Sequence, residues 1–500
     1  MASLVEIIEE STLVDGPQIT GPSKVKPGGV DPLGLRQINF DLMDEVLPGL
    51  NNVAALLRPF ILMGWAWRRA RAIVNAGKKG GATDQELRDF VDRIEAIFAW
   101  SQFLDDPAAG IPGGQALAAL LDPSTTRYQF GGKAWESRRN LRRTSTGLIS
   151  PLNYGPGLRA MGWLAPTDAV GVFRTNPELD AALDAFEASF ADELDHPAFS
   201  KLGSIEVDRD DVERWGQLWS LGATTFVEQQ AGFNRLAGKA ADPQRRLGLQ
   251  LVERAFSELR LDNEEVEVED LRRLMAEMPD TWLDAEELTS TALAWRRLQI
   301  RQLFRLALES TFYWLLGILE GEPRSSRSLG ALFAVSAGGE DFESSADWLQ
   351  ADASENPVSL MDALSSAVRD EDETALPIAI AAALAFCLCQ RDYSAAAFEV
   401  FDRLPLLRAM QDFDAWGELP PEETCAKIIE SWIIAQHTYW SVGRGLADAR
   451  GRGKTLLRLR IVMDEGGWTL TPGTSQGNPP NPTPDRLQTA MSLLLECGRL

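Results

Sequence analysis

Apolar residues recur every three or four positions along most of the chain. In the stretch 84–104 they occupy positions 87, 90, 91, 94, 97 and 98. This spacing places them on one face of an α-helix. Three more stretches show the same period: residues 211–236, 246–260 and 285–319. We therefore predict an all-α, predominantly helical fold.

Strand patterns are scarce. Residues 457–471 are typical either of a β hairpin around Glu465-Gly466-Gly467 or of a helix that ends at these glycines. The sequence therefore allows at most a small β hairpin near the C-terminus.

Breaks in the helical pattern predict two lobes. Glycine and proline mark residues 14–32 as an extended arm, and they return, together with acidic residues, between positions 321 and 345. We place the main boundary in this second break. The predicted parts are an extended N-terminal arm (1–32), an N-terminal helical domain (33–330, with a subdivision near 150–165) and a C-terminal helical domain (331–500). Within the last part, an acidic connection spans 340–373 and a terminal helix spans 484–497.

The composition limits the partners and the cellular compartment that the sequence favours. The chain carries 49 Lys and Arg against 73 Asp and Glu, a formal net charge of −24, which disfavours contact with nucleic acid or an anionic membrane over the whole surface. Four cysteines without a C-x-x-C pair predict neither a disulfide framework nor a zinc ribbon. Two apolar stretches, residues 53–67 and 375–389, are shorter than the ~20 residues that span a bilayer, so we interpret them as buried core helices. Because the acidic N-terminus is unlike a secretory signal, we expect a cytoplasmic protein that contacts no membrane.

Residues that could carry chemistry are few. Gly453-Lys454-Thr455 resembles the end of a phosphate-binding loop, but Asp448 stands where that loop needs a glycine, so we favour a basic turn. The acidic cluster at 262–270 has the carboxylates of a metal or acid–base site. It lacks a nearby lysine or histidine, and we interpret it as a solvated linker with a helix start. The sequence therefore predicts no metal site and no cofactor.

One cluster could hold a general base. Of the two histidines, His196 precedes a proline and is expected in a turn, whereas His437 lies on a predicted helix near Tyr439, Arg444 and Cys425. A packed or hydrogen-bonded helix histidine is the interpretation we favour. We therefore predict no catalytic residue.

Arginines define two candidate interaction surfaces. Arg297, Arg301 and Arg305 stand four residues apart on one face of the predicted helix at 285–319, and because arginine is frequent at interface centres we predict that they bind a protein partner. Three basic segments, residues 65–79, 127–143 and 444–460, would form a nucleic-acid groove if they converged in space. Their candidate contacts are Arg68, Arg69, Arg71, Arg138, Arg139, Arg142, Arg143, Arg450, Arg452 and Lys454.

Two segments carry a family resemblance. Residues 31–71 contain Asp-Pro-Leu-Gly, an acidic helix that ends at Leu-Pro-Gly and an apolar helix that reaches Trp-Arg-Arg, and residues 151–163 read PLNYGPGLRAMGW. Together with the C-terminal PTPDRLQTAMSLLLECGRL, this pattern resembles a family of uncharacterised proteins from bacterial anti-phage defence islands. The resemblance implies a cytosolic component that works with partners from the same operon, such as ATPases, helicases or nucleases. It implies no catalytic residues.

These observations lead to a function hypothesis. We expect a non-enzymatic scaffold or adaptor subunit of a multi-protein bacterial anti-phage defence complex, because tryptophan-rich helices and arginine stripes supply interaction surface and no catalytic constellation is visible. Its partners would be other protein subunits. A DNA- or RNA-binding or sensing subunit that uses the three basic segments is the alternative, and an enzyme of unrecognised type is the third.

Overall fold

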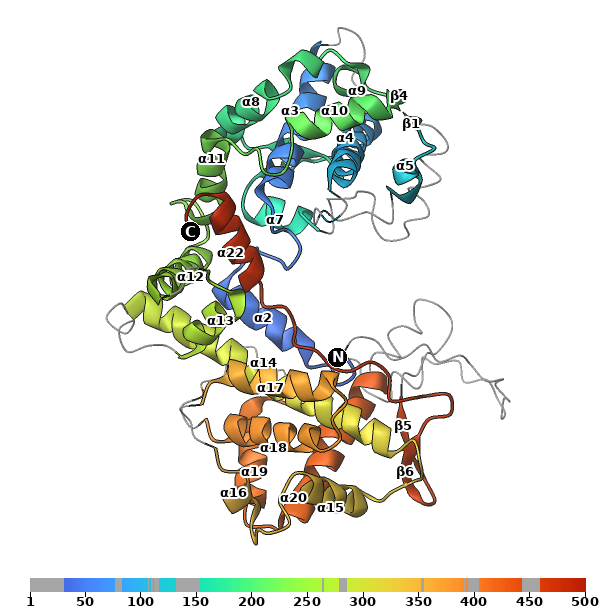
Figure 1. Cartoon of the computed structure of the whole chain (residues 1–500), viewed down its shortest axis with the longest axis vertical. Helices are drawn as coiled ribbons and strands as arrows, with labels where there is room; N and C mark the ends of the chain where they lie inside the picture. Colours follow the sequence, from blue (N-terminus) through green and yellow to red (C-terminus); the bar gives the residue numbers. More distant parts are fainter. Residues whose placement is uncertain are drawn as a thin grey trace.

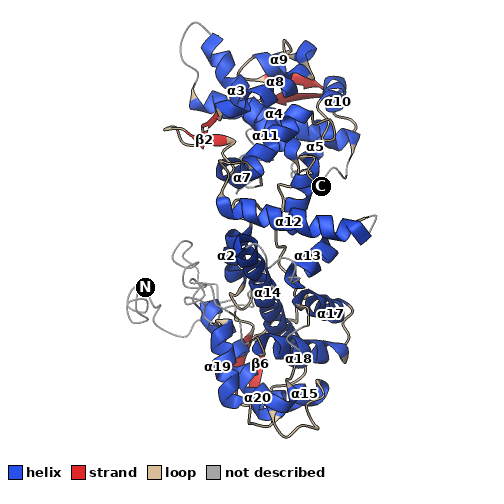
Figure 2. Cartoon of the chain, turned by 90° about the vertical axis from the view of Figure 1, so that its left-hand side faces the viewer, coloured by secondary structure: helices blue, strands red, loops and turns tan. Residues whose placement is uncertain are grey.

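The computed structural model places most of the chain in two helical lobes stacked along one long axis (Figures 1 and 2). It describes residues 31–76, 83–106, 108, 111, 117–131, 153–262, 265–277, 286–351, 355–390, 393, 404–442 and 459–500. This part is predominantly helical, and its strands form only small antiparallel pairs, which confirms the predicted all-α fold.

The first lobe contains the helices between residues 36 and 277 together with two pairs of short strands. Its α-helices are α2 (Arg36–Val46), α3 (Leu57–Ala76), α4 (Asp84–Asp105), α5 (Ala118–Leu121), α7 (Gly155–Ala160), α8 (Asp180–Ala188), α9 (Pro197–Ser200), α10 (Arg209–Leu218), α11 (Phe226–Ala237), α12 (Pro243–Asp262) and α13 (Val268–Glu277). Two 3₁₀ turns, η2 (Pro177–Leu179) and η3 (Ala191–Glu193), flank α8. Strand β1 (Arg127–Phe130) pairs with β4 (Ile205–Asp208), and β2 (Leu164–Pro166) pairs with β3 (Phe173–Thr175), both antiparallel.

The second lobe is organised around one long helix, α14 (Glu286–Ile318), which crosses from the waist of the molecule into this lobe (Figure 2). It is followed by α15 (Ser326–Ser336), α16 (Ser345–Trp348), α17 (Pro357–Arg369), α18 (Ala375–Leu388), α19 (Leu406–Trp416) and α20 (Pro421–Lys427), and then by a π-helical segment, η6 (Ile428–Ile434). The two alternatives at 457–471 resolve to a hairpin, with β5 (Ile461–Asp464) paired to β6 (Gly467–Leu470). The terminal helix expected at 484–497 is present as α22 (Leu487–Glu496).

Each lobe has its own apolar core, and the border between the cores lies inside α14. Leu298 packs in the first core and Ile300 in the second. The boundary expected near residue 330 therefore lies within the second core. Proline and glycine between positions 321 and 345 end a helix there, but they do not separate two cores, because α14 and α15 both pack in the second lobe.

Each end of the described chain packs in the core of the lobe other than the one formed by the residues next to it in sequence. Leu33 and Leu35 lie in the second core although α2 belongs to the first, and α22 packs its buried Leu493 and Leu494 in the first core. Glu496 of α22 accepts a hydrogen bond from the backbone nitrogen of Leu57 at 2.5 Å, at the start of α3. Burial raises the pKa of this carboxyl group. The expected arm at 1–32 lies almost wholly outside the described residues.

The two apolar stretches at 53–67 and 375–389 belong to core helices. Residues 57–67 of α3 are buried, and α18 packs against α14, α17 and α19. No helix of the described residues reaches the length and hydropathy that crossing a bilayer requires.

Candidate functional site

A proline-rich segment, residues 476–485, connects the hairpin to α22 and runs beside α14 (Figure 1). We call it the strap. Its prolines at positions 479, 480, 482 and 484 lack backbone N–H donors and favour an extended, PPII-like backbone. The strap accordingly forms no helix or strand, and side chains from the rest of the molecule hold it in place.

A buried group of charges lies under the middle of the strap. Arg305 on α14 has no exposed surface, and its Nη1 donates to Glu309 Oε2 at 2.7 Å while its Nη2 donates to the carbonyl oxygen of Asn481 at 2.9 Å. Arg36 at the start of α2 reaches the same Glu309 oxygen at 3.1 Å. Burial lowers the pKa of Arg305, and the Glu309 carboxylate opposes this shift. The strap is thus fixed to α14 through the backbone carbonyl of Asn481, and the ion pair with Glu309 holds the Arg305 side chain that binds it.

A second group fixes the end of the strap. Asp485 accepts hydrogen bonds from Arg272 Nε at 2.6 Å and from Gln299 Nε2 at 3.0 Å, so it joins α13 to α14. The next residue, Arg486, has a left-handed backbone with φ of 68°, and its N–H donates to Asn52 Oδ1 at 2.7 Å. Asn52 in turn donates to the carbonyl oxygen of Pro484 at 2.9 Å. These contacts direct the chain into α22.

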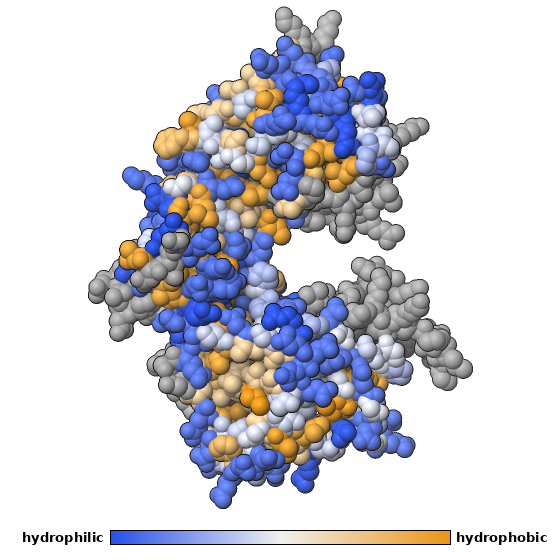
Figure 3. Space-filling view, in the orientation of Figure 1, coloured by the Kyte–Doolittle hydropathy of each residue, from blue (hydrophilic) through white to orange (hydrophobic). Residues whose placement is uncertain are grey.

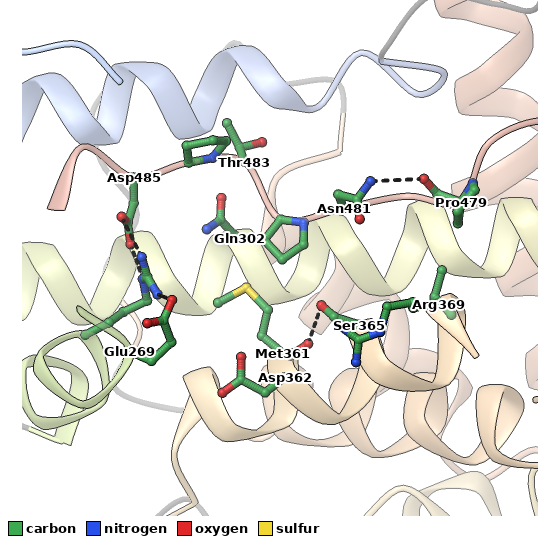
Figure 4. A pocket seen from close by; sticks show the side chains of 14 residues that line it. Glu269, Gln302, Met361, Asp362, Ser365, Arg369, Pro479, Asn481, Thr483 and Asp485 are labelled. Atoms are coloured by element: carbon green, nitrogen blue, oxygen red, sulfur yellow. Dashed lines mark hydrogen bonds and ion pairs between the residues drawn. The ribbon is translucent and has the colours of Figure 1, made fainter. Parts of the chain in front are cut away.

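Two cavities of about 470 Å³ each lie on the two sides of the strap. Both are lined by Pro479 and by residues 481–484. The first cavity, drawn in Figure 4, is completed by Glu269 and Arg272 of α13, by Gln302 of α14 and by the side of α17 that carries Met361, Asp362, Ser365, Val368 and Arg369. The second cavity is completed by Pro32, Arg36, Phe40, Glu309, Phe312, Tyr313, Leu316 and Arg460.

The first cavity presents hydrogen-bonding groups of both kinds. In Figure 4 the Gln302 amide points from α14 toward the strap, and Asp485 lies against the Arg272 guanidinium. The Thr483 side chain is 6% exposed, and its hydroxyl has no hydrogen-bond partner among the described residues. The described lining contains no histidine, cysteine or lysine. The cavity can therefore hold a small polar molecule by hydrogen bonds, with Thr483 as a free hydroxyl.

Of the three arginines predicted to bind a partner, Arg301 and Arg305 are buried and Arg297 is partly exposed. Arg301 and Arg305 are 0% exposed, and Arg297 donates to Glu45 Oε2 at 2.5 Å. Arg301 lies over the ring of Phe304 with 5.3 Å between the guanidinium carbon and the ring centroid. Their four-residue spacing does place them along one side of α14. That side is covered by α2, the strap and the second lobe, so the prediction of an exposed stripe is wrong for Arg301 and Arg305.

The described arginines of the first basic segment serve contacts within the first lobe. Arg68 forms an ion pair with Asp184 at 2.7 Å. Arg69 donates to the carbonyl oxygens of residues 194 and 199, and Arg71 donates to that of Phe173. The other candidate nucleic-acid contacts, Arg138, Arg139, Arg142, Arg143, Arg450, Arg452 and Lys454, lie outside the described residues, as does Gly453-Lys454-Thr455. Convergence of the three basic segments stays a prediction.

His437 is a buried, hydrogen-bonded residue, in line with the interpretation we favoured. Its Nδ1 lies 2.9 Å from the carbonyl oxygen of Pro32, and its Nε2 accepts the backbone N–H of Arg460 at 3.0 Å. These two partners require a neutral ring that is protonated on Nδ1. Burial lowers the pKa of His437 to about 4. Of the other described members of the expected general-base cluster, Tyr439 is 57% exposed and Cys425 is buried.

The remaining candidates also have structural contacts. His196 Nδ1 accepts the backbone N–H of Ala198 at 3.1 Å and so caps α9. In the acidic cluster, Glu269 pairs with Arg272 and Asp270 pairs with Arg273. Among the described residues, no group of three or more His, Cys, Asp or Glu side chains could hold a metal ion.

The strap and its two cavities are the feature that sequence reasoning missed. Glycine and proline mark residues 472–484 as a break in the helical pattern, but such a break does not indicate which helix the segment crosses. Comparisons of the chain with protein-family models, curated proteins and solved structures return no match.

Proposed function

We propose that the chain is a non-enzymatic scaffold or adaptor subunit of a multi-protein bacterial anti-phage defence complex. One observation carries the proposal: two lobes with separate cores are held together by a shared helix of 33 residues and by a strap that is fixed at both its middle and its end. Such a frame keeps surfaces on different lobes at a constant separation, as a subunit that positions partners requires. The resemblance of residues 31–71 and 151–163 supports the defence context.

Purification from the native host tests this proposal. The tagged full chain is recovered from lysate with and without nuclease, and co-purifying proteins are quantified by mass spectrometry against a tag-only control. We expect protein partners in fixed stoichiometry that survive nuclease treatment. Recovery without any stoichiometric partner would contradict the proposal. Loss of the partners on nuclease treatment would favour the nucleic-acid-binding alternative instead.

Phage protection supplies the functional part of the test. Deletion of the gene should remove protection if the chain belongs to a defence complex, and the full-length chain should restore it. Protection that is unaffected by the deletion would contradict the defence assignment. The scaffold assignment would then be decided by the purification experiment alone.

A further inference from the structure

Helix α18 has an apolar surface on the side that faces solvent. Residues 375–388 read ALPIAIAAALAFCL and contain no charged or strongly polar side chain. A helix that is apolar on all sides is normally covered on all sides. Here Ile378 is 50% exposed, Ala382 is also exposed, and Ala375 and Ala379 are partly exposed.

These four residues form one continuous stripe. Their spacing of i, i+3, i+4 and i+7 places them on a single face of α18, over a length of about 10 Å. The adjacent helix α17 also exposes an alanine, Ala363. Figure 3 shows this area as an orange and tan patch over α17 and α18 on the second lobe. We call it the α18 face.

Acidic residues border the α18 face at the start of the helix. Residues 370–373 read DEDE, and all four are exposed. Asp372 has a local role, because its Oδ1 accepts the backbone N–H groups of Thr374 and Ala375 at 3.0 and 2.9 Å. Asp370 pairs with Arg369 at 3.6 Å. No ion pair within the described residues involves Glu371 or Glu373.

We propose that the α18 face docks an amphipathic helix of a partner protein that carries apolar residues three and four positions apart and lysine or arginine beside them. The apolar side chains would cover Ile378 and the alanines, whose small size lets a second helix approach to about 8 Å. The basic side chains would pair with Glu371 and Glu373. Nucleic acid and anionic lipid are disfavoured, because their phosphates would be repelled by the acidic border. This inference rests on the proposed scaffold function and names the chemistry of one partner.

Site-specific cross-linking tests the docking proposal on the full chain in its native host. A photoreactive benzophenone amino acid is placed at position 382 and, as the matched control, at Val335, which is 54% exposed on α15 of the same lobe. The cross-linked peptides are identified by mass spectrometry. We expect position 382 to capture a peptide of another protein with net positive charge and helical apolar spacing, and Val335 not to capture it. Capture of a second copy of this chain, of its own residues or of a peptide without that pattern would overturn the proposal, as would the absence of a cross-link while partners co-purify.

Two substitutions provide an independent measurement. Ile378→Asp should reduce recovery of that partner at least tenfold, while Val335→Asp should leave it unchanged. The double substitution Glu371→Gln, Glu373→Gln should weaken recovery of the partner and make it less sensitive to salt. Because glutamine keeps the size of the side chain, this variant still tests the proposal if Ile378→Asp fails to fold. If partners are recovered equally with all variants, the docking proposal is wrong although the scaffold function holds. If the wild-type chain recovers no stoichiometric protein, the scaffold function itself is wrong.

Discussion

At the scale of single residues, His437 connects the start of the described chain to the second lobe. Residues 31–35 lie against the helical turns at 435–442, where the Gln436 side chain donates to the carbonyl oxygen of Leu33 at 2.7 Å. Gly34 has φ of +73°, and a Cβ atom there would lie 2.4 Å from the ring of Trp440. His437 completes the contact through Pro32 and, on its other nitrogen, accepts the N–H of Arg460. Only the neutral ring can make both bonds, so this contact depends on pH.

The shifted pKa of His437 predicts a loss of stability in acid. The folded-state pKa of about 4 lies below the ordinary histidine pKa of 6.5, so between these values the unfolded chain binds more protons than the folded chain. The contribution is complete above pH 6.5 and is lost as pH falls to about 4, by about 3 kcal/mol in the free energy of unfolding. Urea unfolding at pH 7 and pH 4.5 measures the free energy of unfolding of the wild type and of His437→Gln. This free energy should change less with pH in the variant than in the wild type. His196, a partly exposed histidine whose pKa is also lowered by burial but less strongly, is the comparison, and His196→Gln should reduce the pH dependence less. Equal pH dependence in wild type and His437→Gln would contradict the assignment.

At the scale of elements, helix contacts in the second lobe depend on glycine. A Cβ atom on Gly330 of α15 would lie 2.4 Å from the carbonyl oxygen of Glu422 and 2.5 Å from the backbone nitrogen of Ala426 in α20. Because both atoms belong to the backbone, only a shift of one helix can make room. The close packing of α15 on α20 thus requires glycine at this position.

Gly330→Ala is therefore expected to destabilise the protein by about 1–3 kcal/mol, the range for overpacking a core. The higher helix propensity of alanine offsets part of this, since it favours the variant by up to about 1 kcal/mol. Gly321→Ala is the matched control, because nothing lies within 4 Å of its added Cβ atom. Chemical denaturation of both variants measures the difference, and an unchanged midpoint for Gly330→Ala would show that the helices adjust without cost.

The helices were predictable from sequence because their signal is local. The period of apolar residues gave the helical class, and glycines at 466 and 467 marked the hairpin turn as one of two alternatives. Burial of Arg301 and Arg305 was not predictable, because it depends on the strap and on α2, which are distant in sequence. The same spacing on a helix at the surface would have produced the expected stripe. The polar side chains of the first cavity come from four separate segments, so no motif in the sequence marks them.

At the scale of the whole molecule, the strap joins the two lobes. Asp485 receives hydrogen bonds from α13 and α14, and Asn481 receives one from Arg305 within the second core region. Asp485 is 3% exposed. Its removal leaves the Arg272 guanidinium without its main partner in a largely buried position, which costs several kcal/mol in comparable cases.

We expect Asp485→Ala to lower the free energy of unfolding by about 3–5 kcal/mol and to affect both lobes. Hydrogen exchange with mass spectrometry should detect faster exchange in α22 and in α13 and α14, while Asp341→Ala, at an exposed aspartate, should leave both unchanged. Faster exchange confined to α22 would mean that the strap fixes only the last helix and does not join the lobes.

The placement of α22 has a consequence for synthesis on the ribosome. The first core takes residues from 38 to 298 and Val358 of α17, and it is completed by residues 487–497, about 190 residues after Leu298 in the chain. At typical elongation rates this delay is about 10 to 40 s. During that time the start of α3 lacks Glu496, and the apolar surface that Leu493 and Leu494 will cover is open to chaperones. A nascent chain that stops before residue 487 therefore retains this exposed surface, which marks it for quality control.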